Sequence, residues 1–160
     1  MSKGKRSLEE CRKMIYAGFC SGWTAESQLK YIVEDYFVVA LTKTNNFHSF
    51  DYRDHQGRFY MIRQKFSNYN SYNRVSIKMD KIVHAECMQC DCYFVFAFEN
   101  GMYYYKYTPS LGHVDFIPDT PKGDHMKGED TFVYIKKEKL ILMDLNNLFI
   151  PIHLEKELVL

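Results

Sequence analysis

The stretch "SFDYRDHQGRFYMIRQK", residues 49–65, places two aromatic-rich segments on either side of a short polar turn. The first segment carries Asp51 and Asp54, "HQG" supplies the turn, and the second segment runs through Arg63 to Lys65. Such segments flanking a glycine-containing turn predict a β-hairpin. Because strand side chains alternate in direction, Arg63 and Lys65 are expected on one face of the second strand.

The residues before this hairpin predict helices. In "TAESQLKYIVEDYFVVAL", residues 24–41, apolar side chains recur with the helical period behind an N-cap at Thr24. Glu26 falls in register with the apolar face, so we expect it to project from the buried side near the helix start. Further upstream, "SLEE" is a capping box that opens a short helix from Ser7 to about Phe19. Residues 1–6 are expected to form a flexible basic tail.

The residues after the hairpin predict further strands. "CYFVFAF" and "MYYYKYT" flank "ENG", whose Asn-Gly pair is a strong hairpin signal. "HVDFI" and "TFVYIKK" are two more candidate strands, separated by the polar segment 118–130, and residues 145–160 suggest a short helix with a tail. Two N-terminal helices followed by a run of antiparallel strands indicate an α+β protein. We expect a mixed or antiparallel sheet flanked by the N-terminal helices.

Composition limits the function classes. The 160 residues suit a single domain, and 46% hydrophobic with 16% aromatic residues is typical of a globular chain. Basic and acidic side chains number 21 and 20, so binding of a polyanion requires a local patch. No apolar run is long enough to span a bilayer, the start lacks an apolar signal segment, and the five cysteines suit a reducing compartment. We therefore expect a cytoplasmic or nuclear protein without a membrane partner.

The order of these features resembles the PD-(D/E)xK, or restriction-endonuclease-like, nuclease superfamily. Members carry a helix glutamate, an aspartate on one strand, and an acid (or Gln) two residues before a lysine on the next strand. Here Glu26 precedes Asp51, and Lys65 ends the second strand. The "CDCYFVFAFENGMYYYKYTP" segment is similar to the strand and hairpin that follow in several members. The resemblance covers residues 24–110, which we expect to form a nuclease-like core.

The resemblance implies a metal site, with one departure. Glu26 matches the helix glutamate, Asp51 the first metal ligand and Lys65 the lysine that stabilises developing negative charge, with Mg²⁺ or Mn²⁺ as cofactor if the site is active. Arg63 stands at the second-acid position, and a guanidinium cannot coordinate a cation. Arg63 can still attract a phosphate, and it can also pair with Asp51 or Glu26. The catalytic motif is therefore degenerate. We expect metal-dependent cleavage to be weak or lost, and we assign no cofactor to the degenerate site.

Nucleic acid, DNA in particular, is the expected partner. Arg63 and Lys65 can contact phosphates, and "KFSNYNSYNR", residues 65–74, adds Tyr69, Tyr72 and Arg74, which can stack on bases and hold phosphates. A structural interpretation of the same residues stays open. Residues 65–74 have the composition of a surface loop with turn-forming asparagines, and the charges of the hairpin can be ordinary exposed pairs.

Three alternatives also remain open. The first is an active Mg²⁺- or Mn²⁺-dependent DNA endonuclease whose atypical ligands come from Glu26, Asp51, Asp54 or Gln64. The second is a non-catalytic module that forms homodimers through its aromatic strands. The third is a zinc site built from the closely spaced side chains of "HAECMQCDC", namely His84, Cys87, Cys90 and Cys92.

Overall fold

The computed structural model describes residues 25–45, 48–109, 115–118 and 131–145. Its elements, in chain order, are α2 (Ala25–Phe37), β1 (Thr42–Lys43), β2 (Tyr52–Arg53), β3 (Phe59–Gln64), the 3-10 helix η1 (Tyr69–Ser71), β4 (Arg74–Lys78), α3 (Met79–Met88), β5 (Cys92–Phe98), β6 (Gly101–Tyr107), β7 (Ile117–Pro118), β8 (Phe132–Lys136), the 3-10 helix η3 (Lys137–Lys139) and β9 (Ile141–Leu142). The expected basic tail, the expected helix from Ser7, residues 119–130 of the polar segment and residues 146–160 lie outside the described residues. None of the described helices is long and apolar enough to cross a membrane.

The α+β class and the mixed sheet are confirmed, and the expected run of purely antiparallel strands is wrong. The central sheet has the order β1-β2-β3-β5-β6-β9. Strands β1, β2 and β3 form an antiparallel meander, and β5 and β6 form the expected hairpin. Between them, β3 and β5 are parallel, with Phe59 opposite Cys92 and Gln64 opposite Ala97.

The parallel pair is joined by a crossover whose elements the sequence analysis did not predict. A parallel connection needs a crossover of a dozen or more residues, and here η1, β4 and α3 supply it. In β4, Val75 and Ile77 are buried while their neighbours are exposed, which is the period of a half-buried strand. In α3, Ile82 and Ala85 are the buried residues, three positions apart on one helical face. Thus residues 74–88 form an ordered strand and helix.

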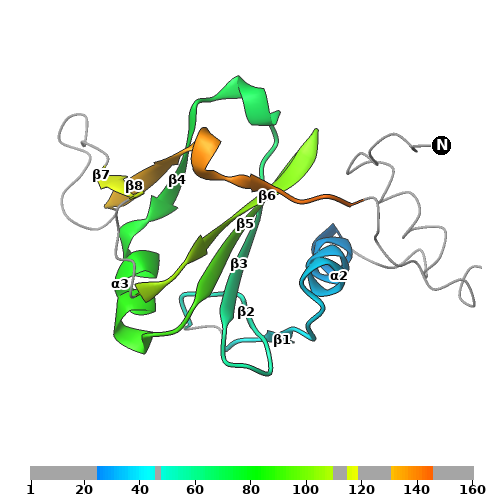
Figure 1. Cartoon of the computed structure of the whole chain (residues 1–160), viewed down its shortest axis with the longest axis vertical. Helices are drawn as coiled ribbons and strands as arrows, with labels where there is room; N and C mark the ends of the chain where they lie inside the picture. The colour runs from blue at the N-terminus through cyan, green and yellow to red at the C-terminus, as the bar shows by residue number, and fades with distance from the viewer. Residues whose placement is uncertain (1–24, 46–47, 110–114, 119–130, 146–160) are drawn as a thin grey trace, which may run out of the picture.

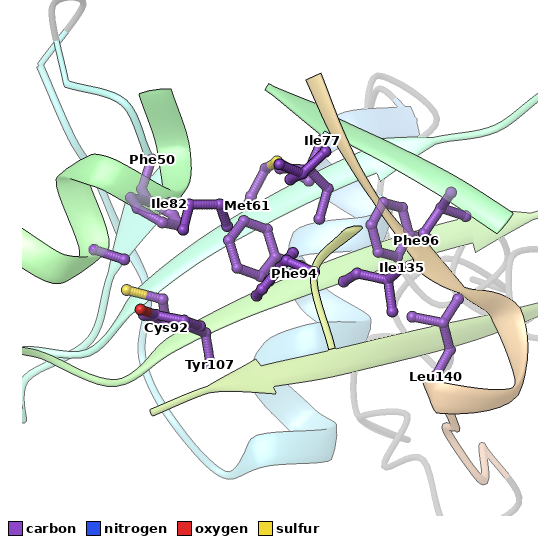
Figure 2. Close-up of a cluster of buried hydrophobic side chains, with 14 of the residues drawn as sticks. Phe50, Met61, Ile77, Ile82, Cys92, Phe94, Phe96, Tyr107, Ile135 and Leu140 are labelled. Carbon is purple, nitrogen blue, oxygen red and sulfur yellow. The ribbon is translucent and has the colours of Figure 1, made fainter. Parts of the chain in front are cut away.

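Two layers of side chains cover the two faces of the central sheet. Figure 1 shows α2 on one side, and α3 with the small sheet β4-β8-β7 on the other. The core under α2 includes Leu29, Ile32, Val33, Tyr52, Tyr60, Tyr93 and Val95. The second core, shown in Figure 2, includes Phe50, Met61, Ile77, Ile82, Phe94, Phe96 and Ile135. Successive β5 side chains enter opposite cores, which is why every residue of this strand is buried.

Helix α2 ends four residues earlier than its apolar pattern predicts. α2 stops at Phe37, and Val38 adopts a left-handed backbone with φ 55°. The Glu34 side chain then accepts a hydrogen bond from the Leu41 N–H at 2.8 Å, while Leu41 itself remains buried. The chain therefore turns at Val38 toward β1 while the apolar residue after it still contributes to the core.

The predicted hairpin turn is organised by Asp54, which is 5% exposed. Its carboxylate accepts hydrogen bonds from the backbone N–H groups of Gln56 and Arg58, from Arg58 Nε at 2.7 Å, and from the Tyr60 hydroxyl at 2.8 Å. Gly57 has φ +80°, a conformation that glycine adopts without strain. The turn fixes the register between β2 and β3, and this register positions Asp51.

Candidate functional site

A cleft of about 310 Å³ lies at the edge of β3, beside the start of α2. β2 pairs with only Phe59 and Tyr60 of β3, so the later part of β3 lies beyond the end of β2. We call this hollow the edge cleft, and its lining consists of Glu26, Leu29, Asp51, Tyr52, Ile62, Arg63 and Gln64. The structure thus brings together three residues that the sequence motif placed on separate elements: Glu26, Asp51 and Arg63.

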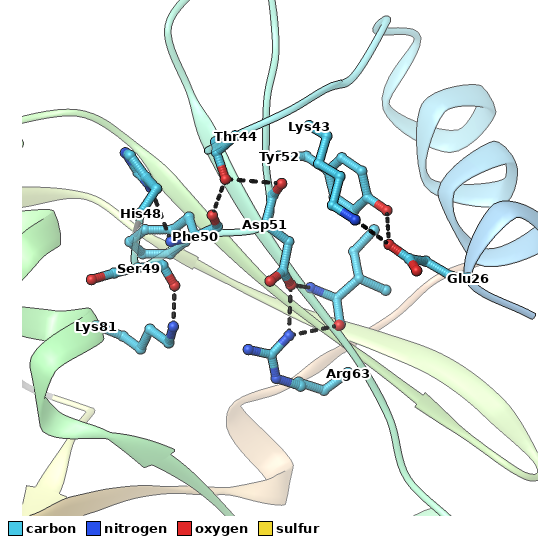
Figure 3. Close-up of polar contacts among 11 residues, drawn as sticks. Glu26, Lys43, Thr44, His48, Ser49, Phe50, Asp51, Tyr52, Arg63 and Lys81 are labelled. Atoms are coloured by element: carbon cyan, nitrogen blue, oxygen red, sulfur yellow. Dashed lines mark hydrogen bonds and ion pairs between the residues drawn. The ribbon is translucent and has the colours of Figure 1, made fainter. Parts of the chain in front are cut away.

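Asp51 is held by the strand beside it and by Arg63. Its Oδ2 accepts hydrogen bonds from the Ile62 N–H at 3.0 Å and from Arg63 Nη1 at 2.6 Å. The same guanidinium nitrogen donates to the Ile62 carbonyl oxygen at 3.1 Å (Figure 3). The Asp51 and Arg63 side chains are 30% and 42% exposed, so the pair stands at the cleft surface. A metal ion that used this carboxylate oxygen would have to displace the guanidinium.

Glu26 lies at the cleft margin and not on the buried face, so that expectation is wrong. Its side chain, in the first turn of α2, is 63% exposed. Glu26 Oε1 accepts a hydrogen bond from the Tyr52 hydroxyl at 2.8 Å and lies 3.6 Å from Lys43 Nζ. The Tyr52 hydrogen bond, followed by the Lys43 charge, lowers the pKa of Glu26.

Lys65 lies outside the lining of the edge cleft and borders a second, smaller hollow. This hollow of about 140 Å³ we call the aromatic groove, and its lining includes Lys65, Ser67, Tyr69, Tyr72, Arg74 and Lys137. Lys65 Nζ lies 5.7 Å from the centre of the Phe96 ring. Burial, followed by the charge of Arg63, lowers the pKa of Lys65. Since Arg63 and Lys65 are two positions apart on an extended chain, their side chains leave the backbone on the same side.

The aromatic groove gathers the candidate nucleic-acid-binding residues of segment 65–74, but it gives them different roles. The Tyr69 ring stacks on Tyr103 with centroids 3.9 Å apart and planes at 6°. Its hydroxyl donates to the Lys137 carbonyl oxygen at 2.8 Å, so Tyr69 is part of the scaffold. Tyr72, by contrast, is 68% exposed. The Arg74 guanidinium lies 4.3 Å from the centre of the Tyr134 ring.

Two cations near these sites were not predicted from the sequence. Lys81, on α3, donates to the Ser49 carbonyl oxygen (Figure 3). Burial lowers the pKa of Lys81, and the positive charge of Arg63 lowers it further. Lys137, in η3, reaches the aromatic groove and holds its Nζ 5.2 Å from the centre of the Tyr69 ring. Neither residue carries a local sequence signal, because each becomes a neighbour only through tertiary packing.

The structure removes Asp54 from the four residues that the active-endonuclease alternative offers as metal ligands. Asp54 is committed to the hairpin turn, where hydrogen bonds from the protein outweigh burial and lower the pKa of its carboxyl. It does not line the edge cleft, whereas Gln64 is exposed and does. A metal ion in the edge cleft would therefore depend on Glu26, Asp51 and Gln64.

The zinc alternative gains no support from the four side chains on which it rests. His84 and Cys87 lie on α3, where the His84 ring faces His48 at 4.6 Å between centroids. Cys92 begins β5 and is fully buried, and this burial raises the pKa of its thiol to about 12. Among the described residues, no group of three His, Cys, Asp or Glu side chains is arranged to hold a metal ion.

The aromatic strands that suggested a homodimer surface serve mainly as core. Every residue of β5 is buried, and the β6 tyrosines from Tyr103 to Tyr105 are half-buried, with Tyr104 packing under α2 and the other two against the second core. Their aromatic content is therefore explained by packing between the layers.

Comparison of the chain with protein-family models, with curated proteins and with solved structures finds no match in any of the three.

Proposed function

We propose that this chain is a nucleic-acid-binding protein with a PD-(D/E)xK nuclease-like fold and a degenerate cleavage site. The observation that carries the proposal is the Asp51–Arg63 ion pair at 2.6 Å, which occupies the carboxylate that the family resemblance assigns to a metal. DNA is the proposed partner, and metal-dependent cleavage is proposed to be weak or lost.

The order of the described elements supports the nuclease-like core. A helix that begins beside Glu26, a strand next to Asp51, a tight turn and a strand that leads into Lys65 follow one another as the resemblance requires. The β5–β6 hairpin then follows, as the resemblance also requires. Asp51 and Arg63 are brought into contact by the β2–β3 register, so their spacing has a structural consequence.

The charges near β3 support phosphate binding. Arg63, Lys65 and Lys81 lie close enough that Arg63 lowers the pKa of both lysines. Among the described residues, Lys65 forms no ion pair with an acidic side chain, although it is half-buried. A phosphate would bring compensating negative charge to Lys65, since charge-assisted hydrogen bonds to phosphate are among the strongest in proteins.

The test combines binding with cleavage. Full-length protein is mixed with labelled DNA and with supercoiled plasmid, in Mn²⁺ or in EDTA. We expect DNA binding in both solutions and no cutting in either. The Arg63→Ala, Lys65→Ala double variant should bind more weakly, and the slope of log affinity against log salt should fall by about 0.9 for each duplex phosphate that the variant no longer binds.

A matched control removes the same charge from elsewhere. Lys106 and Lys139 lie 3.5 Å and 3.8 Å from Asp91 and Asp115, and neither lines the edge cleft or the aromatic groove. The Lys106→Ala, Lys139→Ala double variant should retain the affinity and salt slope of the parent. Equal losses in both double variants, or no loss in either, would refute the role of Arg63 and Lys65.

The active endonuclease remains the second candidate, because Glu26, Asp51 and Gln64 share one cleft. Mn²⁺-dependent plasmid cutting that disappears in Asp51→Ala would establish it. A protein that neither binds nor cuts DNA would instead favour the interaction module, and sedimentation would then show whether a stable homodimer forms.

A further inference from the structure

The aromatic groove presents one exposed ring among positive charges. Tyr72 is 68% exposed, and among the described residues its ring stacks on no other aromatic side chain. It follows η1, and its extended backbone (φ −132°, ψ 156°) leads directly toward β4. A tyrosine ring offers a flat apolar face on which a nucleobase can stack, with little dependence on which base it is.

Among the described residues, the groove lining contains three cations and no acid. The cations are Lys65, Arg74 and Lys137. Lys65 and Lys137 form no ion pair with an acidic side chain in the described part of the chain. The chain as a whole is nearly neutral, with a formal net charge of +1, so this concentration of positive charge is local. Its charge is complementary to a phosphodiester backbone.

The segment that carries Tyr72 is tied to the rest of the fold. The Tyr69 N–H donates to Asn100 Oδ1 at 2.8 Å, and the Tyr69 ring is stacked on Tyr103. The Lys137 N–H donates to the Asn73 carbonyl oxygen at 3.0 Å, which joins η3 to the residue after Tyr72. These contacts hold the groove in place before any ligand arrives, so binding does not require the loop to be ordered first.

The groove is also small. Pockets for drug-sized ligands have volumes of about 300–1,000 Å³, whereas this one has about 140 Å³. An exposed ring can stack only on a base whose face is free, and the bases of a duplex are covered by their neighbours. The geometry therefore favours an unpaired nucleotide over a base pair.

We propose that the aromatic groove binds an unpaired nucleotide of single-stranded nucleic acid. The base stacks on Tyr72, and the adjoining phosphates lie against Lys65, Arg74 and Lys137. This inference rests on the proposed function, which states that the chain binds nucleic acid, and it adds which form of nucleic acid is preferred.

Fluorescence anisotropy with full-length protein tests the inference. The probes are a labelled oligothymidylate and a labelled duplex of the same length, in the same buffer with EDTA. We expect the single strand to bind more tightly than the duplex. Tyr72→Ala should weaken single-strand binding by about tenfold, since the loss of one base–aromatic stack has that order of effect, and should leave duplex binding within about twofold. Because Tyr72 is exposed, its removal is not expected to unfold the protein.

Two further variants make the test specific. Tyr72→Phe keeps the ring and should keep the affinity. Phe66→Ala removes another exposed aromatic side chain, 83% exposed, which does not line the groove and should have little effect. A loss in Phe66→Ala equal to that in Tyr72→Ala would overturn the assignment to the groove.

The remaining outcomes separate this inference from the proposed function. If Tyr72→Ala binds the single strand as well as the parent while Arg63→Ala, Lys65→Ala still weakens DNA binding, the inference is wrong and the proposed function stands. A duplex preference in the parent also overturns the inference alone. If the parent binds neither probe, both proposals fail.

Discussion

Arg63 Nη1 lies 2.6 Å from Asp51 Oδ2, and the same nitrogen also donates to the Ile62 carbonyl oxygen. Arg63, at the second-acid position, therefore neutralises Asp51 and links it by hydrogen bonds to the backbone of β3. A fixed cation stands where the family resemblance expects a second metal ligand. We expect this ion pair to affect the affinity for DNA, the binding of divalent cations and the free energy of unfolding.

Asp51→Ala should increase DNA affinity in EDTA. The substitution releases the Arg63 guanidinium from an exposed ion pair worth about 0.2–1 kcal/mol, which corresponds to an increase of up to about fivefold. It also leaves the Ile62 N–H without its carboxylate partner, so the free energy of unfolding should fall by about 1 kcal/mol. Asp91→Ala, which removes a carboxylate paired with Lys106, is the matched control and should have a smaller effect on affinity. A loss of DNA affinity in Asp51→Ala would contradict the proposal that Arg63 binds phosphate at a degenerate cleavage site.

Arg63→Glu should create a divalent-cation site. A glutamate at this position would place a second carboxylate beside Asp51, with Glu26 in the same cleft. Mn²⁺ at a hundred times its Kd would stabilise the variant by about 2.7 kcal/mol and raise its Tm by roughly 5–10 °C. Arg63→Gln, which removes the charge without adding an acid, should respond far less. The measurement is the Tm in Mn²⁺ against EDTA, and an unchanged Tm in Arg63→Glu would show that the two carboxylates do not converge.

Asp54→Ala should destabilise the hairpin by about 2–4 kcal/mol, because Arg58 and several hydrogen-bond donors lose a buried acceptor. Tyr60→Phe removes one of these bonds and should cost about 1 kcal/mol. The pKa of Asp54 is lowered in the folded state, so the ionised carboxylate favours folding. Its contribution is complete above the unfolded pKa of about 4 and is lost as the pH falls through the folded pKa.

Denaturant unfolding of the parent and Asp54→Asn at several pH values tests this linkage. The difference in unfolding free energy between the two proteins should be constant near neutral pH and should shrink below about pH 4. A difference that does not depend on pH would show that the Asp54 charge does not contribute.

Val38→Gly should stabilise the protein by about 0.5–1 kcal/mol. Val38 has φ 55°, a left-handed conformation that costs an L-residue about 1–2 kcal/mol, of which the greater chain entropy of glycine offsets a part. Its side chain is 85% exposed, so little packing is lost. Gln89→Gly is the comparison, since Gln89 has φ 53° but is not β-branched and also donates from Nε2 to the Glu86 carbonyl oxygen. Thermal melting should show a larger gain for Val38→Gly, and a decrease in its Tm would contradict the strain argument.

Local patterns were sufficient for the elements that depend on neighbouring residues. The helical period of residues 24–41 predicted α2, and the glycine turns predicted both hairpins. The early end of α2 was not predicted, because the apolar period continues through Val38 while the Glu34 side chain turns the chain toward β1. The cysteines of residues 84–92 suggested metal binding. Residues 84–88 instead belong to α3, whose buried face carries Ile82 and Ala85.

The candidate site also has features that were evident from the sequence and features that depend on tertiary packing. The spacing of Asp51, Arg63 and Lys65 was evident from the sequence, as was the option that Arg63 pairs with Asp51. The sequence could not show that Lys65 would border a separate groove, that Tyr69 would be committed to Tyr103, or that Lys137 would join Tyr72 and Arg74. The position of Lys137 depends on β8 pairing with β4, and that of Tyr69 on the packing of η1 against β6, so both join distant parts of the chain.

The sequence by itself determined the α+β class, helix α2, the two hairpins and the arginine at the second-acid position. Each depends on the periodicity, turn residues or side-chain chemistry of a short segment. Only the tertiary structure decided that β3 and β5 run parallel, that Arg63 contacts Asp51 in the edge cleft, and which cations surround the exposed ring of Tyr72. The physical reason is that these contacts join segments through burial of shared apolar faces. A local pattern specifies which face is apolar but not which partner covers it.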